Sequence, residues 1–290
     1  MKLAIHCANL SWSGGPSALG PTLAEVARTA DRGGIDTLTM MDHWFQMETL
    51  GGPSEPMLEG YTSLGFLAGQ TSNLELGLLV TGVTYRHPGL LAKIVTTLDV
   101  LSGGRAMLGL GAAWYQREHE GLGVPFPPTA ERFERLEETL QICRQMFGGG
   151  GGSFDGQHYR LADATNVPPP LRTGGPRVVV GGSGERKTLR LVAQYADACN
   201  LFGFDAEVMR HKLEVLDRHC SDVGRNPGDV QRTALYGDDP VDDPDTFLKR
   251  AEGWAALGIE QVFVMTRPHD PVAWVTRLAE DIRPRLAEIG

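Results

Sequence analysis

Asp42 and His43 are the residues whose types and spacing most directly suggest chemistry, because they end the apolar run of TLTMMDHWFQ at residues 37–46. A carboxylate beside an imidazole can move protons or hydrogen-bond a cofactor, since histidine titrates near neutral pH. A structural use is equally open, in which Asp42 caps the next segment and His43 is a satisfied edge residue. The place of this run in the fold decides between the two.

A glycine-rich turn is the second candidate. In VVVGGSGERKTLRL an apolar strand pattern passes through Gly181, Gly182, Ser183 and Gly184 into a helix pattern. The backbone N–H groups of such a turn, together with a helix N-terminus, can bind phosphate. The turn lacks the Gly-Lys-Ser/Thr of a Walker loop and the full dinucleotide fingerprint. Plain turn chemistry is about as common for such a pattern, so both uses stay open.

Strand-like and helix-like segments alternate along the chain, which is typical of βα units around a parallel sheet. The predicted strands cover 2–7, 37–41, 74–83, 105–111, 177–182, 198–202, 230–236 and 261–265. Helical patterns cover 22–34, 87–104, 131–147, 243–258 and 270–289. Eight strands favour a closed (β/α)8 TIM barrel, because an open sheet of that size leaves edges exposed. Barrels of this kind use about 250 residues as one domain, so we expect a single domain over residues 1–290.

Residues 148–176 interrupt the alternation, because they are too long and too rich in proline and glycine for a simple helix-to-strand loop. We interpret them as an insertion between helix 4 and strand 5. The run Gly148–Gly152 is a flexible tether on the favoured interpretation and the hinge of a lid on the other.

The carboxyl ends of barrel strands meet at one mouth, where binding and catalytic groups lie. This rule favours a functional use for Asp42 and His43. It brings to the same mouth His6, Thr81, Gly109, Gly111 and residues 181–184. Aromatic residues in predicted loops near the rim are Trp12, Trp44, Trp114 and Tyr115, which can form walls for a planar ring or cover the core. Gly77 and Gly82 within strand 3 suggest a bulge or a close backbone approach.

Composition excludes several classes. The net charge of −9 without a basic patch argues against a nucleic-acid partner. No run of about 18 apolar residues and no signal peptide is present, so we expect a cytoplasmic protein without membrane contact. The four cysteines are scattered, with neither the spacing of a metal site nor that of a disulfide framework, and we expect no metal.

The segments LVTGVTYRHPGLLAKIVTTLDVLSGGRAMLGLGAAW, FERLEETLQICRQMF and VVVGGSGERKTLRLVAQYADACN strongly resemble the luciferase-like monooxygenase superfamily. The likeness is greatest to its coenzyme F420-dependent branch and extends through about residue 235. It implies a barrel with a segment inserted before strand 5, a homodimer, and F420 or a flavin bound at the mouth.

By the same resemblance, a non-proline cis peptide on strand 3 is expected at Leu78–Leu79, behind the deazaflavin ring. Asp42 is expected to hydrogen-bond the ring edge, with Thr81 and the Gly111–Ala112 backbone lining it. Gly181–Gly184 would hold the phosphate of the cofactor side chain.

His43 matches the active-site histidine of the F420-dependent sugar-phosphate dehydrogenases and is expected to be the acid/base group, with His6 as a second pocket residue. Those enzymes carry a proton-donating Glu where this chain has Trp114, and their tryptophan after the Asp-His pair is displaced to Trp44. These departures argue against a sugar phosphate as substrate. We place Trp44 and Trp114 in the substrate pocket.

Three functions follow as hypotheses. The first is an F420-dependent oxidoreductase that transfers a hydride between C5 of the deazaflavin and a small organic substrate. The second keeps the barrel but uses reduced FMN and oxygen as a monooxygenase. The third is a non-catalytic F420- or flavin-binding protein, suggested by Trp114 in place of the acid.

Overall fold

A closed barrel of parallel strands forms the centre of the protein in the computed structural model, which describes residues 1–203, 205–267 and 269–290. The hydrogen-bonded order is β3-β2-β1-β11-β10-β9-β8-β5-β4, and a further β3–β5 pairing closes the ring. β4 continues the line of β3, so the barrel has eight strand positions. Their bounds are β1 Lys2–Cys7, β2 Thr37–Met40, β3 Glu75–Leu78, β4 Thr81–Gly82, β5 Ala106–Gly111, β8 Arg177–Gly181, β9 Ala198–Phe202, β10 Gln231–Tyr236 and β11 Gln261–Met265. The predicted (β/α)8 barrel is confirmed.

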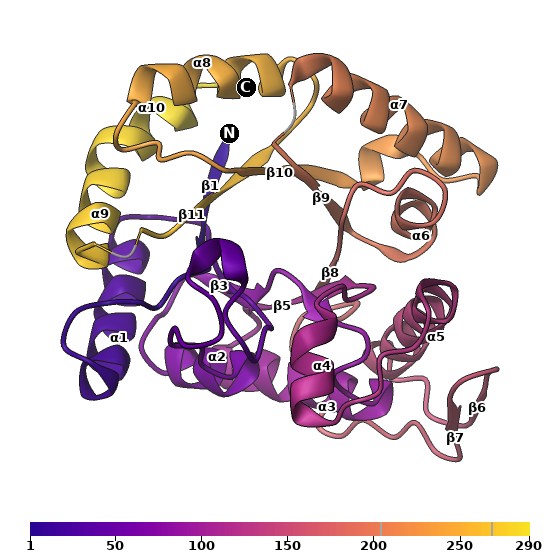
Figure 1. The fold of residues 1–290 in the computed structure, drawn as a ribbon. Helices are drawn as coiled ribbons and strands as arrows, with labels where there is room; N and C mark the ends of the chain where they lie inside the picture. The colour runs from indigo at the N-terminus through magenta and orange to yellow at the C-terminus, as the bar shows by residue number, and fades with distance from the viewer. Residues whose placement is uncertain (204, 268) are drawn as a thin grey trace.

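Helices surround the strands on the outside (Figure 1). They are α1 Pro16–Arg32, α2 Gly60–Ala68, α3 Pro88–Ser102, α4 Gln116–Leu122, α5 Thr129–Phe147, α6 Thr188–Tyr195, α7 Ala206–Asp222, α8 Pro244–Ala255, α9 Pro271–Arg277 and α10 Arg283–Ala287, with a π-helical turn at Leu278–Ile282 and 3₁₀ turns at Glu48–Leu50 and Pro227–Asp229. The prediction omitted α2, α4 and α7, and it began the first helix at residue 22, six residues late. No helix in the described part of the chain is long and apolar enough to cross a membrane.

Most residues of these strands are buried, because a strand of a parallel barrel is covered on both faces. Every residue of β5 is buried, as is every residue of β1 except Lys2. Among the helices that cover them, α3 carries the expected end signals at both ends. α3 begins at Pro88 after the capping side chain of His87 and ends at Gly103 in the left-handed conformation.

The expected cis peptide is present but one residue later than predicted, between Leu79 and Val80. Leu79 still belongs to the ladder, since its N–H donates to the Met40 carbonyl at 3.0 Å. The strand therefore leaves the ladder after Leu79, and it rejoins where Thr81 pairs with Leu110. The assignment to Leu78–Leu79 was wrong because only this pairing fixes the position of the break.

Glycines on two neighbouring strands make room for this bulge. A Cβ atom on Gly109 would lie 2.0 Å from the Leu78 carbonyl oxygen. A Cβ on Gly111 would lie 2.7 Å from Val80 Cγ2, and one on Gly181 would lie 2.8 Å from Val80 Cγ1. Since real Cβ contacts do not reach such distances, the bulge requires glycine at these positions of β5 and β8.

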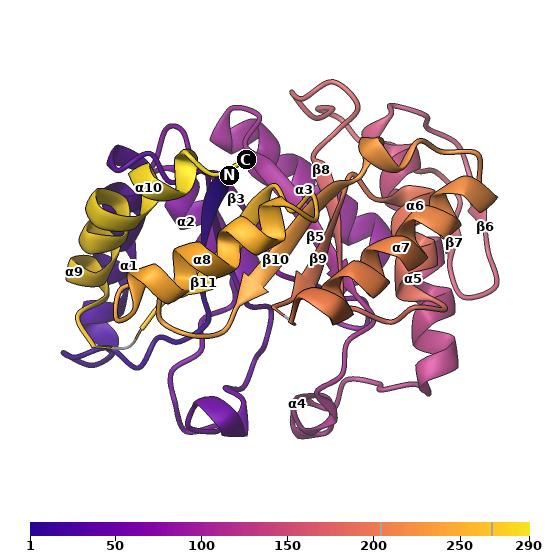
Figure 2. The same cartoon turned by 90° about the horizontal axis from the view of Figure 1, so that it is seen from above.

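Residues 148–176 lie against the outer helices rather than within the barrel. A short hairpin of β6 Phe154–Asp155 and β7 Arg160–Leu161 packs beside α5, where Glu138 accepts hydrogen bonds from backbone N–H groups of residues 157–159. Farther along, Asn166 bonds to Thr96 of α3 at 2.9 Å. Figure 2 shows the hairpin beside the barrel, whereas α4 and the loop after β2 project from the edge where the strands end.

Candidate active site

His6 lies at the end of β1 beside strand β2. Its Nδ1 is 3.0 Å from Thr39 Oγ1, and the side chain is buried. Burial, and to a smaller extent the neighbouring His43, lowers the pKa of His6 to about 4. His6 is therefore neutral at pH 7, which suits a hydrogen-bonding pocket residue better than a proton donor.

Asp42 forms a buried ion pair with Arg86. Guanidinium Nη1 lies 2.6 Å from Oδ2 and Nη2 lies 2.9 Å from Oδ1, while Gly82 N donates to Oδ2 at 3.3 Å. Burial raises the pKa of Asp42 to about 6, and Arg86 limits the rise. Arg86 also bonds to Glu59 and lies over the ring of Tyr61. The expected contact of Asp42 with a cofactor stays a prediction, and such a contact would share oxygens that already accept from Arg86.

Thr81 and the segment after β5 line the mouth beside Asp42. The Thr81 hydroxyl is fully buried and 2.8 Å from that of Tyr61. After Gly111 and Ala112 the chain turns sharply at Ala113, whose φ of 56° is in the left-handed region. Arg132 of α5 holds that turn by donating to the Ala113 carbonyl at 2.8 Å. The turn directs the chain into α4.

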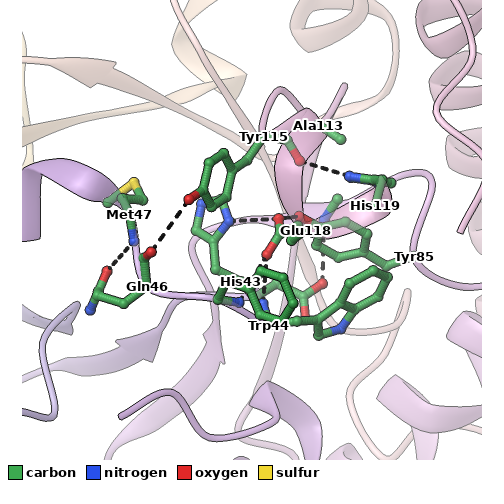
Figure 3. Close-up of polar contacts among 12 residues, drawn as sticks. His43, Trp44, Gln46, Met47, Tyr85, Ala113, Tyr115, Glu118 and His119 are labelled. Atoms are coloured by element: carbon green, nitrogen blue, oxygen red, sulfur yellow. Dashed lines mark hydrogen bonds and ion pairs between the residues drawn. The ribbon is translucent and has the colours of Figure 1, made fainter. Parts of the chain in front are cut away.

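His43 is paired with Glu118 of α4, a residue that the sequence prediction did not identify (Figure 3). The distance from His43 Nδ1 to Glu118 Oε1 is 2.8 Å. Glu118 Oε2 accepts from the backbone N–H groups of Trp44 at 2.7 Å and Phe45 at 3.2 Å. The hydroxyl of Tyr85 also donates to Oε1. A fully buried carboxylate thus holds the expected acid/base residue and the loop that follows it.

Charge pattern alone could not have found Glu118. It lies in QREHEGL, a polar heptapeptide that is typical of a solvated surface, and the neighbouring Glu120 is exposed. Glu118 is buried because it faces the loop after β2, which is 75 residues earlier at His43. The sequence prediction also missed Tyr85, because its contact with Glu118 joins two segments that are distant in the chain.

Aromatic rings surround His43. The Trp114 ring centroid lies 5.4 Å from that of His43, edge on, and Trp114 stacks on Tyr115 at 5.1 Å. Trp114 is 60% exposed, so its indole is open to a ligand. Trp44 packs on Tyr85 at 4.2 Å instead of facing His43. Trp12 is buried among core residues.

The turn after β8 contains an unsatisfied polar atom. Ser183 Oγ is buried and has no hydrogen-bond partner among the described residues. Gly182 has φ 115° and donates to the Asn200 carbonyl at 3.2 Å, so this position needs glycine. α6 begins at Thr188, and the preceding Lys187 supplies no side-chain cap. A buried hydroxyl without a partner beside an uncapped helix N-terminus is the arrangement a phosphate group can complete.

A separate hollow opens at the ends of β10 and β11, with a volume of about 710 Å³. Its rim carries Asp238, Asp239, Asp242 and Asp270 together with Arg267, His269 and Arg277. Arg267 is paired with Asp239 at 3.3 Å, and Arg277 donates to the Val241 carbonyl. The two arginines of this rim thus have partners, and four aspartates make the rim acidic.

Two curated relatives are similar over most of the chain, and both are named F420-dependent glucose-6-phosphate dehydrogenase. The protein from Microbacterium testaceum is 31% identical over 91% of this chain and 77% of its own length. The protein from Kineococcus radiotolerans is 30% identical over 90% of this chain and 75% of its own length.

Solved structures share the fold. The coenzyme F420-dependent tetrahydromethanopterin reductase from Methanopyrus kandleri has a TM-score of 0.77 at 16% identity, covering 98% of this chain and 99% of its own. An F420-dependent secondary alcohol dehydrogenase has a TM-score of 0.79 at 15% identity, covering 98% of both chains. The family model for luciferase-like monooxygenases matches residues 1–237. The chain therefore belongs to the luciferase-like monooxygenase family.

Proposed function

We propose that the protein is an F420-dependent oxidoreductase that acts on a small organic substrate. The observation that carries the proposal is the convergence of His43, the Leu79–Val80 bulge and the glycine-rich turn at one barrel mouth. The relatives named as F420-dependent dehydrogenases support the choice of cofactor. Bound F420 would supply hydride donation and acceptance at C5 of its deazaflavin.

The residues present fit this cofactor. Ser183 Oγ, buried without a partner in the described chain, is an orphan that a phosphate would satisfy, and we assign Gly181–Gly184 to that group. We assign Thr81, the Gly111–Ala112 backbone and Asp42 to the ring. Leu78 and Leu79 were expected behind the ring. Because the bulge follows Leu79, we assign Leu79 and Val80 to the position behind the ring.

His43 is the residue to which we assign the proton. Its Nδ1 faces Glu118, so Nε2 is the atom left for a substrate. During oxidation of an alcohol, Nε2 takes the hydroxyl proton as the hydride leaves the carbon, and during reduction it returns that proton. His6, neutral beside it, is assigned to substrate hydrogen bonding.

We infer that the substrate is not a sugar phosphate. Trp114, exposed beside His43, offers an apolar face to a substrate, whereas Trp44 packs on Tyr85 and is no longer assigned to this face. A neutral alcohol, ketone or enone suits these surroundings better.

The test begins with cofactor binding. F420 fluorescence anisotropy is titrated with the pure protein, and FMN binding is titrated in parallel. Saturable F420 binding with weak FMN binding supports the proposal, whereas FMN binding at micromolar levels without any F420 response supports a monooxygenase.

Turnover is tested next. Reduced F420 is offered enones, imines and quinones, and oxidised F420 is offered alcohols and glucose 6-phosphate. Tight F420 binding without turnover of any of them would identify a non-catalytic carrier.

A homodimer and a cytoplasmic location stay predictions. Support for the dimer comes from exposed apolar side chains on adjacent helices, Phe66 of α2 with Leu90 and Leu101 of α3. Light scattering coupled to size exclusion would distinguish a mass of one chain, 31.4 kDa, from twice that mass.

A further inference from the structure

We propose that Glu118 is a positioning residue, which fixes His43 as the Nδ1–H tautomer and so presents a lone pair on Nε2 to the substrate. The proposal deepens the proposed function, because it concerns the residue assigned to the proton. Glu118 does not touch substrate in this assignment, since its side chain is fully buried.

The hydrogen-bond partners of Glu118 determine the tautomer. Oε2 accepts from two backbone N–H groups, those of Trp44 and Phe45, which can only donate. Oε1 faces Tyr85 Oη and His43 Nδ1. An ionised carboxylate has no proton to give, so His43 Nδ1 must carry the hydrogen in that contact. Nε2 then bears the lone pair.

The ionisation states support this arrangement. Burial by itself would raise the pKa of Glu118, but hydrogen bonds from His43 and Tyr85 outweigh it and hold that pKa below its usual value. Burial, together with the hydrogen bond to Glu118, raises the pKa of Tyr85, so its phenol stays protonated and donates. Glu118 is therefore a carboxylate surrounded by hydrogen-bond donors.

Other titratable groups near the pair do not compete for the proton at neutral pH. Burial lowers the pKa of His6 to about 4 and also lowers the pKa of His119 on α4. Among the described residues, further charged or titratable groups that surround the His43–Glu118 pair are Asp42 with Arg86, Tyr85, Tyr115 and Arg132.

Packing and hydrogen bonds hold α4 in the place where Glu118 can contact His43. A Cβ on Gly121 would lie 2.6 Å from the ring of Phe45, so glycine lets the helix pack closely on the loop after β2. His119 Nε2 lies 2.7 Å from Thr84 Oγ1, which ties α4 to the segment after β4, and His119 Nδ1 lies 2.8 Å from the carbonyl of Tyr115 at the start of α4. These contacts hold the helix in place, so Glu118 has a defined orientation toward His43.

Glu118→Gln is the decisive variant. Its amide oxygen can still accept from the N–H groups of Trp44 and Phe45, which preserves the loop. Its NH₂ group then faces His43 and Tyr85 as a donor, so His43 Nδ1 must become an acceptor and the proton moves to Nε2. Glu120→Gln is the matched control, because Glu120 is exposed on the same helix.

The first measurement needs no cofactor. Proton–nitrogen correlation spectra of protein labelled with ¹⁵N-histidine are assigned by the loss of the His43 signals in His43→Gln. We expect the Nδ1–H pattern for His43 in the wild type and in Glu120→Gln, and the Nε2–H pattern in Glu118→Gln. An Nε2–H pattern in the wild type, or no change in Glu118→Gln, would overturn the proposal whatever the protein catalyses.

The second measurement is turnover. We expect Glu118→Gln to lower kcat about 10- to 100-fold, as loss of an orienting carboxylate does elsewhere, with little change in KM or in F420 binding.

Glu118→Asp keeps the charge and should recover the Nδ1–H pattern of His43 with part of kcat, and it serves as the second variant if Glu118→Gln does not fold. A Glu118→Gln protein with wild-type kcat would contradict the proposal. If the wild type binds no F420, the proposed function fails while the tautomer measurement still decides the role of Glu118.

Discussion

Both carboxylate oxygens of Asp42 accept hydrogen bonds from the guanidinium of Arg86, and the two side chains are 1% and 11% exposed. Removing Arg86 leaves a buried carboxylate without its countercharge. We expect Arg86→Met to lower the free energy of unfolding by about 3–5 kcal/mol, measured by urea denaturation. The double variant Asp42→Asn with Arg86→Met should regain part of that loss. Arg117, whose pair with Glu48 is exposed, supplies the control, and Arg117→Met should change little.

Gly109 has no space for a side chain beneath the bulge. A Cβ there would lie 2.0 Å from the Leu78 carbonyl oxygen, which is backbone and cannot rotate away. Gly109→Ala should therefore destabilise the protein by about 1–3 kcal/mol and weaken F420 binding by displacing the bulge. Gly253→Ala, in α8 with no atom near the new Cβ, should instead stabilise it slightly. Equal effects of the two changes on thermal unfolding would contradict the account of the bulge.

His6 predicts a pH dependence of stability. Its pKa falls from 6.5 to about 4 on folding, so the unfolded chain binds the proton more readily. Above pH 6.5, His6 is neutral in both states and does not reduce the free energy of unfolding. As pH falls from 6.5 toward 4, the unfolded chain binds the proton first, and the free energy of unfolding decreases. Over that range the wild type should lose up to about 3 kcal/mol more than His6→Gln. Parallel curves of unfolding free energy against pH for the two proteins would show that His6 titrates normally.

Ser183 predicts opposite effects on the free and the loaded protein. Its hydroxyl is buried without a partner in the described chain, so Ser183→Ala should leave the free protein as stable or slightly more stable. Loss of a hydrogen bond to phosphate, worth about 0.5–1.5 kcal/mol, should raise the Kd for F420 by roughly 2- to 12-fold. Ser153→Ala, in the segment beside α5, is the control and should leave the Kd unchanged. An unchanged Kd in Ser183→Ala would remove this turn from the cofactor site.

The sequence by itself determined the barrel. Strands 198–202 and 261–265 were predicted with the bounds that the structure gives, because a strand buried on both faces is a mainly apolar run between polar turns. The place of Asp42 and His43 at the mouth followed from the same count of strands. These features depend on neighbouring residues along the chain, so the sequence displays them.

Only the tertiary structure decided which residues contact one another at the candidate site. Nothing local distinguishes buried Glu118 from exposed Glu120, because burial depends on the loop that carries His43. The cis bond falls after Leu79 because Leu79 still pairs with β2, and Asp42 meets Arg86 only once the barrel closes. A hydrogen bond between residues 75 positions apart is fixed by the packing of whole elements, which no short stretch of sequence contains.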